Sequence, residues 1–112
     1  MRLFDLFKKD DIKKADINDV VANIKKEGNA LLVDVREPEE YKIVHIPGSI
    51  NMPLEKLPDK VKDIRNKDIH VYVYCASGIR SSKGVKVFKD AGFTNVTDAG
   101  GIYDYNGPLK AK

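Results

Sequence analysis

A single cysteine, Cys75, is the residue of this 112-residue chain whose type and position best suit it to chemistry. It follows an apolar run of mostly β-branched and aromatic residues over 69–74, and it opens a short loop of small residues. An amphipathic segment that predicts a helix begins after that loop. Because the positive end of a helix dipole and its free N–H groups favour an anion, a cysteine placed there can react as a thiolate. Cys75 is therefore the candidate nucleophile.

The loop that follows Cys75 has the composition of an anion-binding turn. Gly78 permits a backbone conformation that a residue with a side chain resists. Ala76 and Ser77 are small, so the main chain can curl tightly around the sulfur. Such a curl points several N–H groups inward and creates a nest for an anion.

The start of the predicted helix adds a charge and capping groups to this loop. Arg80 supplies a permanent positive charge and a fork of hydrogen-bond donors. Ser81 or Ser82 is expected to cap the helix. Together with the loop, these groups stabilise one negative charge on, or bonded to, Cys75.

Composition limits the classes of function that need to be considered. With 42% hydrophobic and 33% charged residues, the chain has the balance of one small domain with a single core. A net charge of +3 is too weak to indicate a nucleic-acid partner. Asp5 interrupts the first apolar residues and no run reaches membrane-spanning length, so we expect a cytoplasmic protein without a membrane partner.

The inventory of ligating residues argues against a cofactor. The chain has two histidines, one cysteine and scattered acids, so we expect no metal site. It also lacks a phosphate-binding loop and a dinucleotide fingerprint, and we expect no cofactor. A lone cysteine forms no internal disulfide, which fits a reducing compartment.

Helical and extended patterns alternate along the chain, which predicts an α/β architecture with a mostly parallel sheet. The residues between these patterns are typical of turns, and a flexible turn is expected at Gly100–Gly101. We expect helices over residues 16–27, 36–41, 56–66 and 81–91, strands over 30–33, 69–74 and 95–98, a short strand within 45–53, and a last helical turn over 102–105.

Three predicted strands end at residues that could form one site. Asp34 and Arg36 follow one strand, Cys75 follows another, and Asp98 closes a third. Ligands of open α/β sheets bind beyond the carboxyl ends of the strands, so these segments are predicted to converge. We expect Asp34 and Arg36 to form a charge pair or hydrogen bonds that brace the active loop.

Four segments together resemble the single-domain rhodanese family, with an order and spacing that are specific. They are Val33 to Glu37, His45 to Pro53, the loop from Cys75 to Ser81, and Gly100-Gly101-Ile102. The resemblance runs from about residue 14 to the end of the chain. It implies one rhodanese domain over residues 1–112, in which residues 1–13 are an N-terminal extension that precedes the domain or packs on it. The implied fold is a central, mostly parallel five-stranded sheet with helices on both faces.

The resemblance also implies a thiosulfate sulfurtransferase-like activity by a two-step reaction. The Cys75 thiolate attacks the outer sulfur of a small anionic donor such as thiosulfate, releases sulfite and becomes a persulfide. The persulfide then passes its terminal sulfur to a thiophilic acceptor, cyanide or a thiol, which is covalent catalysis. The residues implied as substrate-binding are Ala76, Ser77, Gly78, Ile79, Arg80 and Ser81. Because cysteine is already nucleophilic, His45 is interpreted as a hydrogen-bonded turn residue and not as a base.

Two other interpretations remain open at this point. Ala76 stands where many rhodaneses have arginine, which favours a sulfur-carrier or protein-interaction module with little turnover of free thiosulfate. A persulfide-donor protein would then be a partner. Phosphatases and arsenate reductases of the related type place five residues between cysteine and arginine. Here four residues separate Cys75 from Arg80, which disfavours that class.

Overall fold

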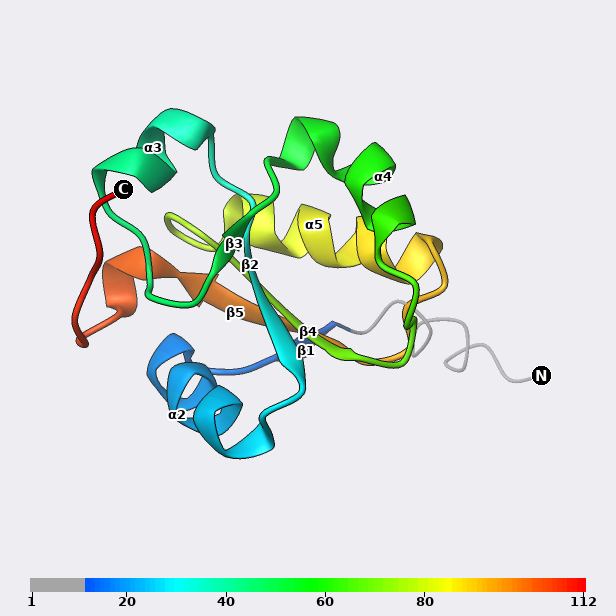
Figure 1. Cartoon of the computed structure of the whole chain (residues 1–112), viewed down its shortest axis with the longest axis horizontal. Coiled ribbons are helices and arrows are strands. Elements are labelled where there is room, and N and C mark those ends of the chain that lie inside the picture. Colours follow the sequence, from blue (N-terminus) through cyan, green and yellow to red (C-terminus); the bar gives the residue numbers. More distant parts are fainter. Residues whose placement is uncertain (1–11) are drawn as a thin grey trace.

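A computed structural model describes residues 12–112 of the chain. Five strands form one sheet in the order β1-β5-β4-β2-β3 (Figure 1), and every neighbouring pair is parallel. The predicted α/β class and five-stranded parallel sheet are therefore confirmed. Residues 1–11 lie outside the described part, so the expected extension over residues 1–13 is seen only at its end. There Lys13 already pairs with Thr97 in the sheet.

Strands and helices alternate along the chain as the sequence pattern predicts. Among the helices of residues 12–112, none is long and apolar enough to cross a lipid bilayer. The elements are β1 (Lys13–Lys14), α2 (Ile17–Glu27), β2 (Ala30–Asp34), α3 (Pro38–Ile43), β3 (Ile50–Asn51), η1 (Leu54–Lys56), α4 (Leu57–Lys60), η2 (Val61–Asp63), β4 (His70–Cys75), α5 (Ile79–Asp90), β5 (Val96–Gly101) and η3 (Ile102–Asp104).

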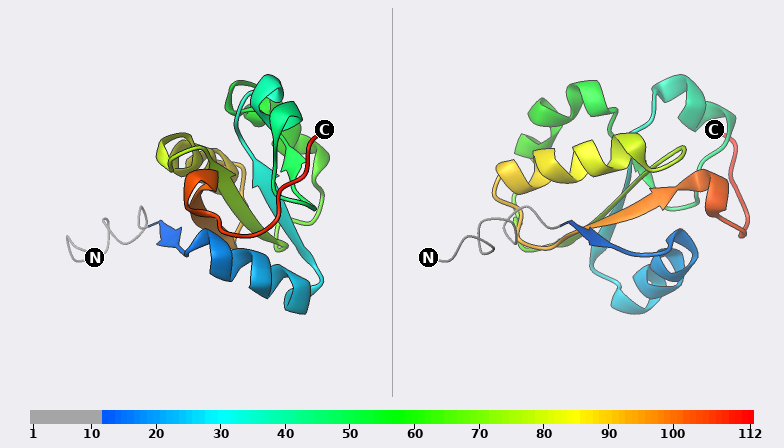
Figure 2. Two further views of the ribbon diagram at one scale, coloured as in Figure 1. Left: turned by 90° about the vertical axis from the view of Figure 1, so that its left-hand side faces the viewer. Right: turned by 180° about the vertical axis from the view of Figure 1, so that it is seen from behind.

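The side chains of β2 and β4 alternate between two apolar layers, as the period of two along a strand requires. One layer lies between the sheet and the helices α4 and α5, and the other lies between the sheet and α2 (Figure 2). Helices therefore cover both faces of the sheet. The first layer receives Val33, Val71, Val73 and Cys75, and the second receives Leu32, Tyr72 and Tyr74.

A glycine lets α5 lie close to the sheet. A Cβ atom at Gly84 would come within 3.1 Å of Val73 Cγ1 and 3.2 Å of Val35 Cγ1, tighter than ordinary van der Waals contact. The absence of a side chain at this position allows the helix to pack directly on β2 and β4. This close packing seats the first turn of α5 against the end of β4.

The segment predicted as one helix over residues 56–66 is instead the succession η1, α4 and η2, which ends before Ile64. Only Leu57 and Val61, one turn apart, are buried from this segment. Ile64 is already extended, and the Asn66 side chain accepts a backbone N–H in the turn that follows. That local hydrogen bond is how asparagine competes with helix formation. The helical prediction therefore holds through Asp63 and was wrong for residues 64–66.

A polar cluster fastens the end of α2 to the sheet. The Tyr72 hydroxyl donates to Glu27 Oε1 at 2.6 Å, and His70 Nδ1 lies 2.9 Å from Glu27 Oε2. The His70 ring stacks on Tyr72 with 3.9 Å between ring centroids. The hydrogen bond from Tyr72 holds the pKa of Glu27 below its ordinary value of 4.5.

We expect Glu27→Gln to lower the free energy of unfolding by about 1 kcal/mol at neutral pH, the scale of one partly exposed hydrogen bond. A carboxylate with a lowered pKa in the folded state stabilises the protein above its unfolded pKa. That contribution disappears as the pH falls through the folded-state pKa. Urea denaturation of both proteins in a series from neutral pH to about pH 3 should therefore show the difference shrinking below pH 4.5. A difference that stays constant over this range would contradict the role given to the Glu27 charge.

Candidate active site

The Cys75 sulfur lies at the start of α5, where it accepts hydrogen bonds from main-chain amides. Cys75 is the last residue of β4, one residue beyond the predicted strand. Its Sγ accepts the N–H of Gly78 at 3.0 Å and the N–H of Ser81 at 3.2 Å. Gly78 adopts a φ of 108°, which turns the loop sharply into the helix. The sulfur thus occupies the place that a capping side chain takes at other helices.

Neither Ser81 nor Ser82 caps α5, so that prediction was wrong. The Ser81 hydroxyl lies 3.0 Å from the Gly78 carbonyl oxygen and 2.7 Å from Asp98 Oδ1, its two acceptors, and the Ser82 hydroxyl donates to the Ile79 carbonyl. The N–H that a capping hydroxyl would accept is directed at the cysteine sulfur instead. The helix begins at Ile79, two residues before the predicted start.

Cys75 is buried directly beneath a surface loop. The residue is 1% exposed, and it belongs to the apolar layer under α4 and α5. Above it, Ser77 and Ile79 are exposed, and Gly78 and Arg80 are half-buried. The sulfur thus lies beneath the turn formed by residues 76–81, and two amides of that turn, from Gly78 and Ser81, point at it.

Gly101 supports the loop from below. The Gly100–Gly101 pair, predicted as a flexible turn, is the end of β5, and Gly101 pairs in register with Cys75. A Cβ atom at Gly101 would overlap the Ala76 carbonyl oxygen and lie 2.7 Å from Ser77 Cα. Glycine is needed at position 101 because the loop backbone packs against the strand there, whereas Gly100 has open space around it and a φ of 79°, which favours glycine.

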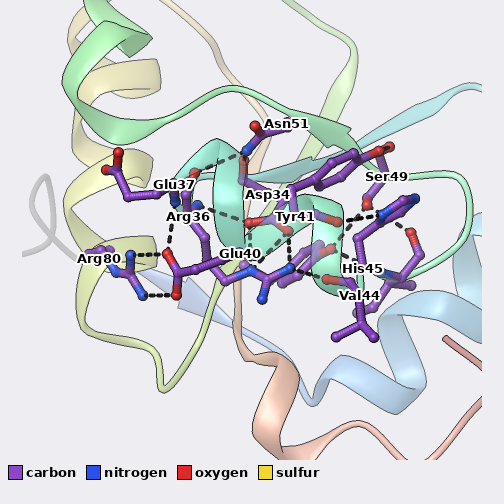
Figure 3. A network of polar contacts seen from close by, with 12 residues as sticks. Asp34, Arg36, Glu37, Glu40, Tyr41, Val44, His45, Ser49, Asn51 and Arg80 are labelled. Atoms are coloured by element: carbon purple, nitrogen blue, oxygen red, sulfur yellow. Dashed lines mark hydrogen bonds and ion pairs between the residues drawn. The ribbon is translucent and has the colours of Figure 1, made fainter. Parts of the chain in front are cut away.

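An ion pair connects the loop to α3. The Arg80 guanidinium donates from Nη1 to Glu40 Oε1 at 2.7 Å and from Nη2 to Glu40 Oε2 at 3.1 Å (Figure 3). These bonds lower the pKa of Glu40 and raise that of Arg80. Sequence reasoning missed Glu40. The local signal was a glutamate in the first turn of a predicted helix, which indicates capping and not a contact with the cysteine loop.

Comparison with known proteins identifies the fold. Residues 17–107 match the family described as the Rhodanese-like domain. The chain belongs to this rhodanese family. The match runs from α2 through η3 and includes Cys75 and its loop.

Relatives of this rhodanese domain include named sulfurtransferases. Thiosulfate sulfurtransferase PspE of Escherichia coli is 36% identical over 73 residues, which are 64% of this chain and 70% of that protein. The thiosulfate:glutathione sulfurtransferase of Saccharomyces cerevisiae is 41% identical over 85 residues, which are 65% of this chain and 61% of that protein. The uncharacterized protein YqhL of Bacillus subtilis is 38% identical over 84 residues, or 74% of this chain and 66% of that protein. The chain therefore spans only part of the length of these relatives, less than two thirds of two of them.

Solved structures show the same rhodanese fold. A rhodanese with anions from E. coli aligns with a TM-score of 0.69 and 32% identity, covering 74% of this chain and 99% of that one. A rhodanese-like domain protein from Staphylococcus aureus aligns with a TM-score of 0.79 and 27% identity, covering 90% of this chain and 99% of that one. The sulfurtransferases among the relatives make this a transferase family.

Asp34 and Arg36 form a buried ion pair in this rhodanese domain. Arg36 Nη2 lies 2.8 Å from Asp34 Oδ2, and the two side chains are 5% and 0% exposed. The same Nη2 donates to the Val44 carbonyl at 2.7 Å, and Asn51 donates to the carbonyls of both paired residues (Figure 3). The pair thus holds both ends of α3, the helix that carries Glu40. Its connection to the cysteine loop is indirect, through α3 and through Tyr74, whose ring centroid lies 5.9 Å from the Arg36 guanidinium carbon.

His45 is part of the same framework. Its Nδ1 lies 2.9 Å from the Tyr41 carbonyl oxygen, and its ring stacks on Tyr41 with 3.8 Å between centroids. The ring is therefore held within the turn after α3. This placement agrees with the interpretation of His45 as a hydrogen-bonded turn residue.

Tyr74, the residue before Cys75, ties β4 to the turn after α3. Its hydroxyl accepts the Ile46 N–H at 3.1 Å and lies 3.0 Å from Ser49 Oγ. We expect Tyr74→Phe to lower the free energy of unfolding by about 1–3 kcal/mol, because the buried Ile46 donor would lose its acceptor. Chemical denaturation of both proteins measures this change in the free energy of unfolding. An unchanged stability would show that the Ile46 N–H finds another acceptor.

Proposed function

We propose that this protein is a sulfurtransferase that moves a sulfane sulfur from a donor such as thiosulfate to a thiophilic acceptor through a persulfide on Cys75. The observation that carries the proposal is the pair of main-chain amides, from Gly78 and Ser81, that point at Cys75 Sγ. Amides at a helix start favour an anionic sulfur. Relatives that are named sulfurtransferases support the same reaction class.

The reaction proceeds in two displacements whose atoms balance. The Cys75 thiolate attacks the outer sulfur of thiosulfate, the S–S bond of the donor breaks, and its electron pair leaves on sulfite. Cyanide or a thiolate then attacks the terminal sulfur of the persulfide, which yields thiocyanate or a new persulfide and restores the Cys75 thiolate. The negative charge lies on Cys75 Sγ before the first step and on the terminal sulfur of the persulfide after it. The loop amides can therefore stabilise the charge in both states, and no general base is required.

The residues of the loop have separate roles in this proposal. Gly78 and Ser81 hold the sulfur through their N–H groups, and the Ser81 hydroxyl fixes the helix start against Asp98. Ala76 and Ser77 form the turn that a donor must pass. Ile79 and Arg80 stand at its rim.

A sulfur-carrier module with little turnover of free thiosulfate is the second candidate. Ala76 brings no charge to the loop, and Arg80 is already paired with Glu40. A persulfide-donor protein would then load Cys75, and a thiol would accept the sulfur. One relative, 35% identical over 77 residues, is a putative sulfur carrier protein of B. subtilis.

A single-turnover experiment tests the proposal and separates its two forms. Protein mixed with thiosulfate in the absence of acceptor should release sulfite in a burst of one equivalent per Cys75, because the persulfide cannot turn over. Addition of cyanide should then release the stored sulfur as thiocyanate. Thiol release from a persulfide donor that loads Cys75, with no sulfite burst from thiosulfate, favours the carrier form. Sulfite release without a plateau at one equivalent contradicts a stored persulfide.

A further inference from the structure

Arg80 is the only cation within residues 76–81, and its guanidinium is already engaged. Both of its terminal nitrogens donate to Glu40, in the two-bond geometry that gives the strongest arginine–carboxylate pairs. The two side chains are 33% and 34% exposed, so the pair lies at the surface beside the loop. A donor that approaches Cys75 therefore meets a neutralised arginine.

Glu40 is held in this position by more than Arg80. Its Oε1 also accepts the N–H of Glu37 at 2.8 Å, which fixes the carboxylate in the first turn of α3 (Figure 3). The bonds from Arg80 keep the pKa of Glu40 below 4.5, so the carboxylate is ionised above that pH. The charges of Cys75 and Glu37 also raise the pKa of Arg80, each less than Glu40 does. Glu40 is thus the main counter-charge of this guanidinium.

Two main-chain amides and one hydroxyl of the loop are engaged within the protein. The amides of Gly78 and Ser81 point at Sγ, and the Ser81 hydroxyl donates a hydrogen bond to Asp98. The Ala76 side chain has no donor. Apart from Arg80, the polar side chains of residues 76–81 are the hydroxyls of Ser77 and Ser81, and neither carries a charge that could balance the two negative charges of thiosulfate as it approaches a thiolate.

Resting on the proposed function, we propose that Glu40 sets the charge preference of the sulfur donor by sequestering Arg80. The site favours donors with at most one negative charge, such as thiosulfonates and alkyl persulfides, over the thiosulfate dianion. Glu40 touches neither the donor nor the cysteine and acts through Arg80, so it is a positioning residue.

Two donors of nearly the same shape isolate this effect. Methanethiosulfonate carries a methyl group where thiosulfate carries one of its oxygens, and it has one negative charge instead of two. With either donor the Cys75 thiolate attacks the outer sulfur and the S–S bond breaks. The electron pair leaves on methanesulfinate in one case and on sulfite in the other. The ratio of kcat/KM for thiosulfate to that for methanethiosulfonate therefore measures charge preference.

We expect Glu40→Gln to raise this ratio about tenfold. The freed charge of Arg80 attracts the dianion thiosulfate more strongly than the monoanion methanethiosulfonate. The rise should appear mainly as a lower KM for thiosulfate and should diminish as salt is added. Glutamine keeps an oxygen that can accept the Glu37 N–H, so the start of α3 is preserved. Glu39→Gln is the matched control, because it removes an exposed charge from the same helical turn without touching Arg80. The ratio of the Glu39→Gln protein should stay within about twofold of the wild-type ratio.

Three results overturn the inference. They are an unchanged ratio in a folded Glu40→Gln protein, an equal rise in Glu39→Gln, and a Glu40→Gln effect that persists when Arg80→Gln is also present. These outcomes differ from failure of the proposed function itself. If neither donor transfers sulfur to the wild-type protein, the sulfurtransferase assignment fails. If methanethiosulfonate transfers sulfur and the ratio does not move, only the role of Glu40 fails.

Discussion

Cys75→Ser is expected to lower the rate of sulfur transfer by at least about a thousandfold, to the background of the assay. A hydroxyl at this position can still accept the N–H groups of Gly78 and Ser81, so the loop keeps its hydrogen bonds. It cannot form a persulfide, and it is a far weaker nucleophile than a thiolate. The thiosulfate:cyanide assay on both proteins, with equal amounts of folded protein, measures the loss.

The serine variant also distinguishes the reaction classes. A sulfur-carrier module would show low thiosulfate turnover in the wild type, and the serine variant would then lose the transfer from a persulfide donor. Retention of either activity in Cys75→Ser would show that Cys75 is not the nucleophile. A robust aryl phosphate hydrolysis that disappears in the variant would revive the phosphatase interpretation.

Gly101→Ala is expected to have the second largest effect. The new methyl group would overlap the Ala76 carbonyl oxygen and crowd the Ser77 backbone, which are parts of the main chain and cannot rotate away. The loop must shift, and a displacement of about 1 Å at a reacting group can cost roughly a hundredfold in rate. We also expect a loss of about 3 kcal/mol in the free energy of unfolding, at the upper end of the usual cost of overpacking.

Gly107→Ala is the control for the same chemical change. A Cβ atom there would meet the end of the Tyr105 side chain, which can move aside. We expect this variant to keep its activity, and chemical denaturation should show a change of no more than about 0.5 kcal/mol. If Gly101→Ala behaves like Gly107→Ala, the loop does not depend on its packing against β5.

Much of the site follows from local patterns that a single sequence displays. The apolar run before Cys75 predicts a buried strand, and the small residues after it predict a tight turn into a helix. Together they place the cysteine at a helix start without any knowledge of distant residues. The parallel sheet follows in the same way, because helices that separate successive strands require crossover connections.

The features that were missed depend on contacts between distant segments. Glu40 lies 40 residues from Arg80, and no local pattern pairs them. Gly100–Gly101 has the composition of a flexible turn, and only the backbone of Ala76 lying against Gly101 explains why the second glycine is needed. The serine caps failed for a related reason, because the sulfur of the preceding strand takes the amide that a hydroxyl would accept.

Storage of one sulfur atom on Cys75 between the two half-reactions would change the mass of the protein. Intact-protein mass spectrometry after incubation with thiosulfate, methanethiosulfonate or an alkyl persulfide, followed by peptide fragmentation, tests it most directly. We expect a gain of the mass of one sulfur atom, located on Cys75 and removed by cyanide. An unchanged mass with every donor, or an added sulfur that remains in Cys75→Ser, would contradict it.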